Sequence, residues 1–185
     1  MRILLLASGS GSLARAICEA KIPGVEIAGL ISDKPCLALE LADEFGFSYQ
    51  VVPMQSDREE WNHQMLKSAA GIRPDLVVSV GFMRILAADF LKQFRVINTH
   101  PALLPSFPGA HAVRDALAAN VSRTGTTVHW VDEGVDTGPI IAQREIAVEQ
   151  GDDESSLHER IKIVERELIV EILTRFAQDG IPEIR

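Results

Sequence analysis

An asparagine and a histidine two positions apart are the residues of this sequence best suited to chemistry. Asn98 and His100 stand in the stretch V-I-N-T-H-P-A-L-L-P-S-F-P-G, between an apolar run and a segment stiffened by prolines. If Val96–Asn98 ends a strand, residues i and i+2 point to the same side. An amide donor and a proton-carrying imidazole suit acyl or formyl transfer. A carboxylate that could reach His100 is Asp136, in the turn-rich loop G-V-D-T-G-P.

Each of these residues also has an ordinary structural explanation. A lone histidine is commonly a surface or core residue, and Asp beside Gly commonly makes turns. His100 nevertheless follows an apolar strand, at the carboxyl edge where α/β sheets bind ligands, which favours the functional interpretation. A negative charge on Asp136 close to His100 would favour the imidazolium, so we expect a raised pKa for this histidine.

A glycine loop near the N-terminus is the second candidate site. The residues G-S-G-S-L-A at positions 9–14 follow the apolar run Arg2–Ala7 and precede a helical pattern. Glycines let backbone N–H groups approach a phosphate, and a helix N-terminus favours the anion. The motif is weak by itself, because tight turns here also serve packing. Asp33 after the next strand could bind ribose in a dinucleotide site, which is the less favoured interpretation.

An apolar loop, G-F-M-R-I-L at residues 81–86, follows a buried strand. Its apolar side chains could cap the core, or they could form a wall for a flat, partly apolar ligand. Among the histidines, His129 could face the site from a strand, and His111 could lie near it. No histidine or cysteine spacing is typical of a metal site, so we expect no metal. We expect His63 and His158 on solvated helix faces.

Apolar runs alternate with helical patterns along the chain, which predicts an α/β domain with a mainly parallel sheet. Ser56-x-x-Glu59 predicts a capping box at the start of one helix, and the acids of Gly151–Glu154 open the last one. The last two expected strands could pair as antiparallel neighbours at the sheet edge. The expected strands are Arg2–Ala7, Glu26–Ile31, Tyr49–Val52, Asp75–Val80, Val96–Asn98, Thr126–Val131 and Ile140–Val148.

Composition places the chain among globular proteins of one ordinary domain. It has 185 residues, of which 46% are hydrophobic, and a net charge of -8. The negative charge argues against nucleic acid as the main partner. The first apolar run is too short for a signal peptide or a membrane helix, and Cys18 and Cys36 do not indicate a disulfide scaffold. We expect a cytoplasmic protein of a single domain, residues 1–185, without a membrane partner.

The motifs G-F-M-R-I-L, N-T-H-P-A-L-L-P-S-F-P-G and G-T-T-V-H-W-V-D-E-G-V-D-T-G-P-I-I-A-Q together resemble the phosphoribosylglycinamide formyltransferase family, in its bacterial type. The resemblance covers nearly the whole chain. It implies a Rossmann-like formyltransferase fold with helices on both faces of the sheet. It also implies transfer of a formyl group from the co-substrate 10-formyltetrahydrofolate to the amine of glycinamide ribonucleotide, in purine biosynthesis and without a metal.

The resemblance assigns roles to particular residues. The catalytic set would be Asn98, His100 and Asp136: Asn98 and protonated His100 would stabilise the oxyanion, and Asp136 would orient His100 and help move the proton. The ribonucleotide would bind the backbone of Gly11, Ser12 and Leu13, with Leu13 standing where many members carry Asn, and also Lys162 and Glu165. The folate would contact Arg58, Met83, Arg84, Ile85, Leu86, Asn98, Val131, Asp132, Glu133, Gly134, Val135 and Asp136.

Ordinary alternatives stay open for some of these residues. Lys162 and Glu165 are also typical of a solvated helix face, and Arg58 is also typical of a first-turn surface arginine. A formyltetrahydrofolate deformylase would carry an additional N-terminal domain, and a methionyl-tRNA formyltransferase an additional C-terminal domain and a basic surface. A non-catalytic nucleotide-binding module would explain the glycine loop and Asp33 but not the catalytic set. We expect small-molecule partners only, and a monomer or homodimer.

Overall fold

The computed structural model describes residues 1–184, in which seven strands form one sheet in the order β3-β2-β1-β4-β5-β6-β7. The first five strands run parallel, whereas β6 is antiparallel to β5 and to β7. This confirms the predicted, mostly parallel sheet with an antiparallel C-terminal edge. The strands are β1 (Arg2–Leu6), β2 (Glu26–Ser32), β3 (Tyr49–Val51), β4 (Leu76–Ser79), β5 (Val96–His100), β6 (Arg123–Trp130) and β7 (Ile140–Ala147).

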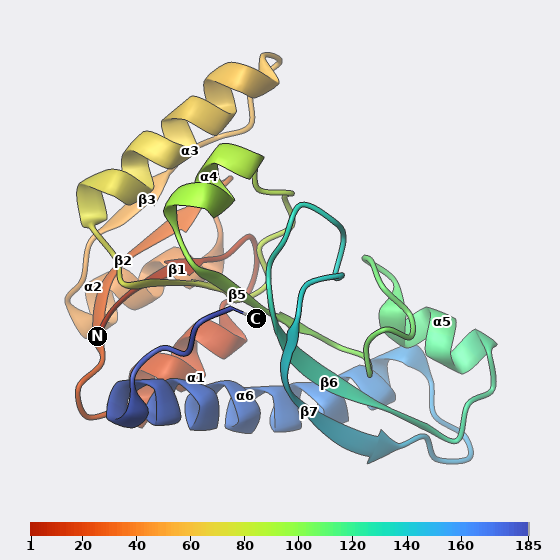
Figure 1. The fold of residues 1–185 in the computed structure, drawn as a ribbon. Helices are drawn as coiled ribbons and strands as arrows, with labels where there is room; N and C mark the ends of the chain where they lie inside the picture. The colour runs from red at the N-terminus through yellow and green to blue at the C-terminus, as the bar shows by residue number, and fades with distance from the viewer. Residues whose placement is uncertain (185) are drawn as a thin grey trace.

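Helices cover both faces of this sheet (Figure 1). The helices α3 and α4 lie on one face, and α1 and α6 lie on the other, where they also pack against each other. The short α5 lies beyond the sheet, beside the first turns of α6. The helices are α1 (Ser12–Ala20), α2 (Glu40–Phe45) after the short 3-10 turn η1 (Leu37–Leu39), α3 (Arg58–Ile72), α4 (Ala88–Gln93), α5 (Ala112–Ala118) and α6 (Glu154–Asp179).

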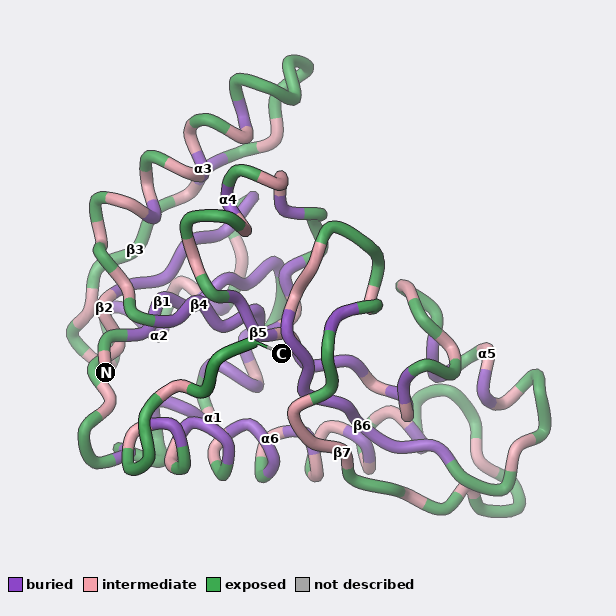
Figure 2. Tube along the Cα trace, in the orientation of Figure 1, coloured by how far each residue is buried: buried purple, intermediate pink, exposed green. Residues whose placement is uncertain are grey.

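The central strands are apolar throughout because both of their faces are covered. Along β1, Ile3 and Leu5 pack toward α1 and α6, whereas Leu4 and Leu6 pack toward α3 and α4. All four side chains are fully buried. Figure 2 shows the buried trace running through the middle of the sheet, with exposed residues on the outer sides of the helices.

Two of the helices begin at aspartates. The α6 helix starts with a capping box in which Ser156 N donates to Asp153 Oδ1 (2.8 Å) and Asp153 N donates to Ser156 Oγ (3.0 Å). For α3 the predicted cap is wrong by one residue. Asp57, not Ser56, accepts the backbone N–H groups of Glu59 and Glu60. Both residue types are good caps, so the sequence alone did not decide between neighbours.

The strand register brings three loops to one edge of the sheet. Leu6 of β1 lies opposite Ser79 of β4, and Ser79 lies opposite Asn98 of β5. The segments that follow these strands therefore start side by side at the carboxyl edge, where ligands bind in α/β sheets. They are the glycine loop, the apolar loop 81–86 and the proline-rich segment after His100.

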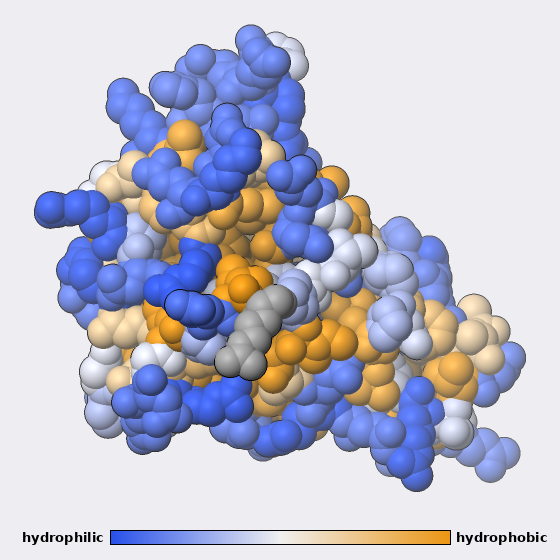
Figure 3. All heavy atoms as spheres, viewed as in Figure 1, coloured by the Kyte–Doolittle hydropathy of each residue, from blue (hydrophilic) through white to orange (hydrophobic). Residues whose placement is uncertain are grey.

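Hydrophobic residues gather in the middle of the face seen in Figure 3, and hydrophilic residues surround them. Across residues 1–184, no helix combines the length and the hydropathy that crossing a membrane requires.

Candidate functional site

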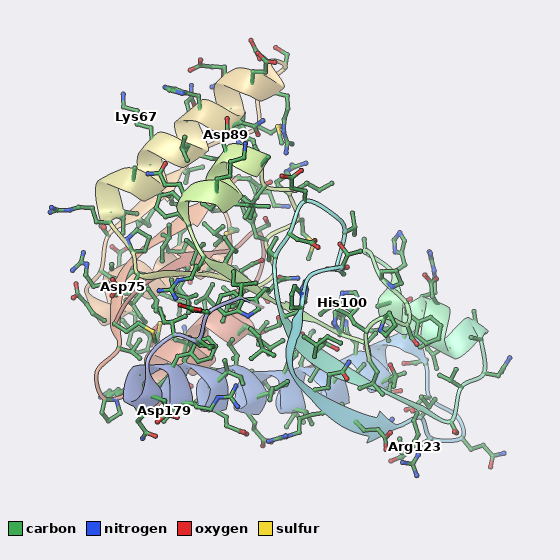
Figure 4. All side chains as sticks on the ribbon, viewed as in Figure 1. Lys67, Asp75, Asp89, His100, Arg123 and Asp179 are labelled. Atoms are coloured by element: carbon green, nitrogen blue, oxygen red, sulfur yellow. The ribbon has the colours of Figure 1, made fainter. Side chains whose placement is uncertain are left out.

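Asn98 and His100 lie on one side of β5, as their spacing predicts. The strand extends to His100, two residues beyond its predicted end, and the histidine is 3% exposed. Figure 4 labels His100 close to the base of the loop that connects β6 to β7. That loop carries Asp136, whose Oδ2 lies 3.3 Å from His100 Nδ1. The structure therefore brings Asn98, His100 and Asp136 together, although Asp136 is 36 positions after His100 in the sequence.

The Asp136 carboxylate is fixed by its backbone and by three polar groups. Its φ of 55° lies in the left-handed region, which Asp tolerates better than most residues. Gly109 N donates to Oδ2 (2.8 Å), and His129 Nε2 lies 3.5 Å from Oδ1. The pKa of Asp136 is lowered to about 2, mainly by its contact with His129 and also by the Gly109 N–H and the charge of His100. Burial alone would raise this pKa, but its effect is smaller. The carboxylate is thus charged at neutral pH.

The predicted rise in the pKa of His100 is wrong. Burial is the largest influence and lowers the pKa, and the charge of Asp136 and the carbonyl of Phe107 oppose it without cancelling it. The ring is held between two acceptors: Nε2 lies 2.8 Å from the Phe107 carbonyl oxygen and Nδ1 faces Asp136. A neutral ring can donate to only one of them, whereas an imidazolium donates to both. The two acceptors therefore favour the imidazolium, whereas burial favours the neutral ring.

His129 also belongs to the site, although the sequence indicated only that it could face it. It pairs with Asn98 across the β5–β6 ladder, and Asn98 Nδ2 lies 3.3 Å from its Nε2. His129 Nδ1 lies 2.8 Å from the Trp130 carbonyl oxygen, and its Nε2 faces both Asn98 Nδ2 and Asp136 Oδ1 (3.5 Å), so it can engage at most one N–H of the Asn98 amide. This leaves the second N–H of the Asn98 amide for a ligand. The alternation of side chains along β6 indicated which face His129 lies on, but the strand register that pairs it with Asn98 cannot be predicted from the sequence.

A cavity of about 360 Å³ opens onto these residues. One wall of the cavity includes Met83 and Ile85, which are 68% and 60% exposed. Leu86 also lines the cavity, but most of its side chain is buried in the core. The opposite wall is the β6–β7 loop, in which Glu133, predicted to contact the folate, does not line the cavity. The predicted folate residues that line it are Met83, Arg84, Ile85, Leu86, Asn98, Val131, Asp132, Gly134, Val135 and Asp136.

Arg58 lies behind the wall rather than in the cavity. Its Nη2 donates to the carbonyl oxygen of Ile85, and its guanidinium stacks 4.5 Å above the ring of Trp61. Arg58 is thus more than a solvated first-turn residue, because it supports the backbone of the apolar loop.

The glycine loop presents backbone at the start of α1. Gly11 has a φ of 75° and precedes the first helical residue, Ser12, without a side-chain cap. Leu13 is 8% exposed and packs in the core, so only its backbone is available to a ligand. The dinucleotide interpretation is not supported, because the Asp33 side chain is 1% exposed and already bonded to Arg84.

Replacing Gly11 with alanine is expected to destabilise the folded protein by crowding the glycine loop. A Cβ at Gly11 would lie 2.8 Å from both Cα and Cβ of Ala38, and the positive φ adds strain. Together these effects predict a loss of about 2 to 3 kcal/mol in the free energy of unfolding, measured in urea. Gly9→Ala is the matched control, because a Cβ there meets nothing within 4 Å. Equal stability of both variants would contradict this prediction.

The two predicted ribonucleotide residues on α6, Lys162 and Glu165, are less exposed than residues on an ordinary solvated helix face. Glu165 is 5% exposed, and burial raises its pKa to about 7 against the opposing effects of the Thr99 and Thr126 hydroxyls and nearby cations. Lys162 pairs with Glu159 at 2.7 Å and is available from the surface. His158, expected on a solvated face, is half-buried and lines the cavity, whereas His63 is exposed. Across residues 1–184, His, Cys, Asp and Glu side chains do not gather into a group able to hold a metal.

The fold and the site define an α/β enzyme that places a proton carrier, a charged carboxylate and an amide donor beside a ligand cavity. The chain belongs to the formyl transferase family, whose model matches residues 1–173. A phosphoribosylglycinamide formyltransferase of Mycobacterium tuberculosis is 46% identical to it, over 97% of this chain and 86% of that protein. The Escherichia coli protein of the same name is 34% identical, over 97% of this chain and 88% of its own.

Solved structures agree with these relatives. The crystal structure of phosphoribosylglycinamide formyltransferase from Bacillus halodurans matches with a TM-score of 0.92 at 34% identity, over 100% of this chain and 99% of that one. Glycinamide ribonucleotide transformylase 1 from Symbiobacterium toebii matches with a TM-score of 0.91 at 35% identity, over 99% of this chain and 91% of that one. The resemblance and the fold predicted from the sequence are thereby confirmed.

Proposed function

We propose that this transferase moves a formyl group from 10-formyltetrahydrofolate to the amine of glycinamide ribonucleotide, in the synthesis of IMP. The observation that carries the proposal is the convergence of Asn98, His100 and Asp136 on one cavity with an exposed apolar wall. The identity of 46% to a phosphoribosylglycinamide formyltransferase supports the same substrates. Both substrates are small molecules, and the formyl-folate is consumed as a co-substrate.

In the proposed reaction the amine nitrogen attacks the formyl carbon, and negative charge develops on the formyl oxygen. A free N–H of Asn98 would donate to that oxygen, and the positive charge of a protonated His100 in the same cavity would stabilise it. Asp136 faces Nδ1 of His100 and favours its protonated form at this stage. The carbon–N10 bond of the folate then breaks, N10 takes up a proton, and the amine gives one up, so charge and protons balance.

We also propose how the two substrates share the protein. The ribonucleotide phosphate would bind the amides of Gly11, Ser12 and Leu13, with Lys162 and Glu165 on α6 contacting the rest of that substrate. The folate would lie between loop 81–86 and the β6–β7 loop, which are the two walls of the cavity. The division into a ribonucleotide-binding N-terminal half and a catalytic C-terminal half, the cytoplasmic location and the monomeric or homodimeric state stay predictions.

Formyl transfer should require both substrates. Incubating the purified protein with 10-formyltetrahydrofolate is expected to release tetrahydrofolate only when glycinamide ribonucleotide is added, with one formylated ribonucleotide for each folate consumed. The absorbance change of the folate and mass spectrometry of the ribonucleotide measure the two products. Folate deformylation at the same rate without the ribonucleotide would indicate a hydrolase and overturn the proposed function.

A further inference from the structure

Asp33 is a buried acid that the proposed catalytic set does not use. It follows β2 directly, and its Oδ2 accepts a hydrogen bond from Arg84 Nε at 2.7 Å. The Asp33 side chain is 1% exposed, whereas Arg84 is 39% exposed and lines the cavity. Burial by itself would raise the pKa of Asp33, but the Ser8 hydroxyl and the Arg84 guanidinium outweigh it and the pKa is lowered. A charged carboxylate is therefore held behind the cavity wall.

Ser8 extends this contact to the glycine loop. Its hydroxyl lies beside the Asp33 carboxylate and accepts a hydrogen bond from Met83 N (3.0 Å). Its own backbone N–H donates to the carbonyl oxygen of Gly81 (3.1 Å). The start of the glycine loop and the apolar wall are thus bonded to each other directly. Asp33 is hydrogen-bonded to the wall through Arg84 and lies next to Ser8, and its Oδ1 has no hydrogen-bond partner.

A purely stabilising role does not account for this arrangement well. Buried ion pairs are weak contributors to folding stability, because desolvation of the charges offsets their attraction. What the pair does fix is geometry, since a charge-assisted hydrogen bond restricts the direction of the guanidinium. Arg84 is otherwise a long side chain at the edge of an open cavity, in a loop with two exposed apolar neighbours, Met83 and Ile85.

We propose that Asp33 is a positioning residue for the formyl-folate: it orients Arg84 and, with Ser8, holds the wall of residues 81–86 against the glycine loop. The inference rests on the proposed function, because it takes this wall to be the folate site. It predicts that losing the Asp33 charge weakens folate binding while leaving the reacting groups in place. Asn98, His100 and Asp136 lie on β5 and the β6–β7 loop and do not contact Asp33 through any of the bonds described above.

Asp33→Asn should raise the KM for 10-formyltetrahydrofolate about tenfold, the size expected for one hydrogen bond to a charged group. The kcat and the KM for glycinamide ribonucleotide should change less than about threefold. Binding of tetrahydrofolate, the product, measured by calorimetry without turnover, should weaken by the same factor. If Asp33 acts through Arg84, the folate KM of Arg84→Met should also rise, and Asp33→Asn should add little in that background.

Glu44→Gln is the matched control, because it breaks the Arg15–Glu44 ion pair (2.8 Å) on the surface of α1 and α2. It should leave all three constants unchanged. An unchanged folate KM in Asp33→Asn, additive effects in the double variant, or an equal loss in every constant would overturn the inference. If Asp33→Asn does not fold, Arg84→Lys tests the same bond, because it keeps the positive charge at the cavity but removes the Nε–H that Asp33 accepts, and its folate KM should rise as well. Wild-type formyl transfer is measured in parallel, so failure of the proposed function is recognised separately.

Discussion

Replacing His100 with alanine is expected to reduce kcat for formyl transfer by about 10³-fold, the middle of the range for one general acid–base group. The imidazole is buried, faces the charged Asp136 carboxylate and lines the same cavity as Asn98. Alanine leaves no group that can supply a proton or stabilise charge at this position. Steady-state kinetics with saturating amounts of both substrates measure the loss.

A second histidine substitution separates chemistry from folding. His63 is exposed on α3 and does not line the cavity, so His63→Ala should keep wild-type kcat. His100→Asn keeps a polar side chain between Phe107 and Asp136 and should fold even if alanine does not, with a comparable loss of kcat. Near-normal turnover in a folded His100 variant would show that the assigned proton carrier is wrong.

The meeting of Asn98 and His100 at the carboxyl edge was predictable, because parallel strands end at one edge and alternate residues share a side. The pairing of Asn98 with His129 was not, since it depends on antiparallel register. The direction of the His100 pKa also escaped prediction. The sequence shows the charge of Asp136, but desolvation depends on how completely the folded chain encloses the ring.

Ion pairs that join distant segments were equally hidden. Asp33 and Arg84 are 51 positions apart, and only the order β2-β1-β4 makes their strands near neighbours. On α6 the three-to-four spacing of Leu157, Ile161, Val164, Leu168 and Ile172 predicts a face packed on the sheet, and all of them except the half-buried Val164 are buried. Glu165 belongs to that buried region too, but a glutamate between Lys162 and Arg166 is typical of solvent-exposed helix. The charge pattern therefore wrongly suggested that Glu165 is exposed, whereas the apolar pattern correctly located the buried face of the helix.

Glu165→Gln is expected to stabilise the protein at alkaline pH and to weaken ribonucleotide binding. The pKa of Glu165 is raised from 4.5 to about 7 by burial, so the folded state holds this proton more tightly than the unfolded chain. Stability from this group is therefore full below pH 4.5 and is lost as the pH rises through 7. The difference of 2.5 pKa units corresponds to about 3 kcal/mol, an upper limit for the loss.

Glutamine has nearly the same shape and never ionises, so it removes this cost. In urea unfolding, Glu165→Gln should gain about 2 to 3 kcal/mol over wild type at pH 8 and almost nothing at pH 4.5. The lowered pKa of His100 makes stability fall in acid instead, but it acts on both proteins and cancels in their difference. Glu159→Gln, on the exposed side of α6, is the control and should show no gain at pH 8.

Retention of an acid at this costly position needs a functional reason, since glutamine would make the same fold more stable. The predicted contact with the ribonucleotide would supply one, because a carboxylate beside the Thr99 and Thr126 hydroxyls can accept hydrogen bonds from ribose hydroxyl groups. Glu165→Gln should then raise the KM for glycinamide ribonucleotide about tenfold while the KM for folate stays unchanged. A stabilised variant with unaltered ribonucleotide KM would remove Glu165 from the substrate site, and a stability difference independent of pH would contradict the titration itself.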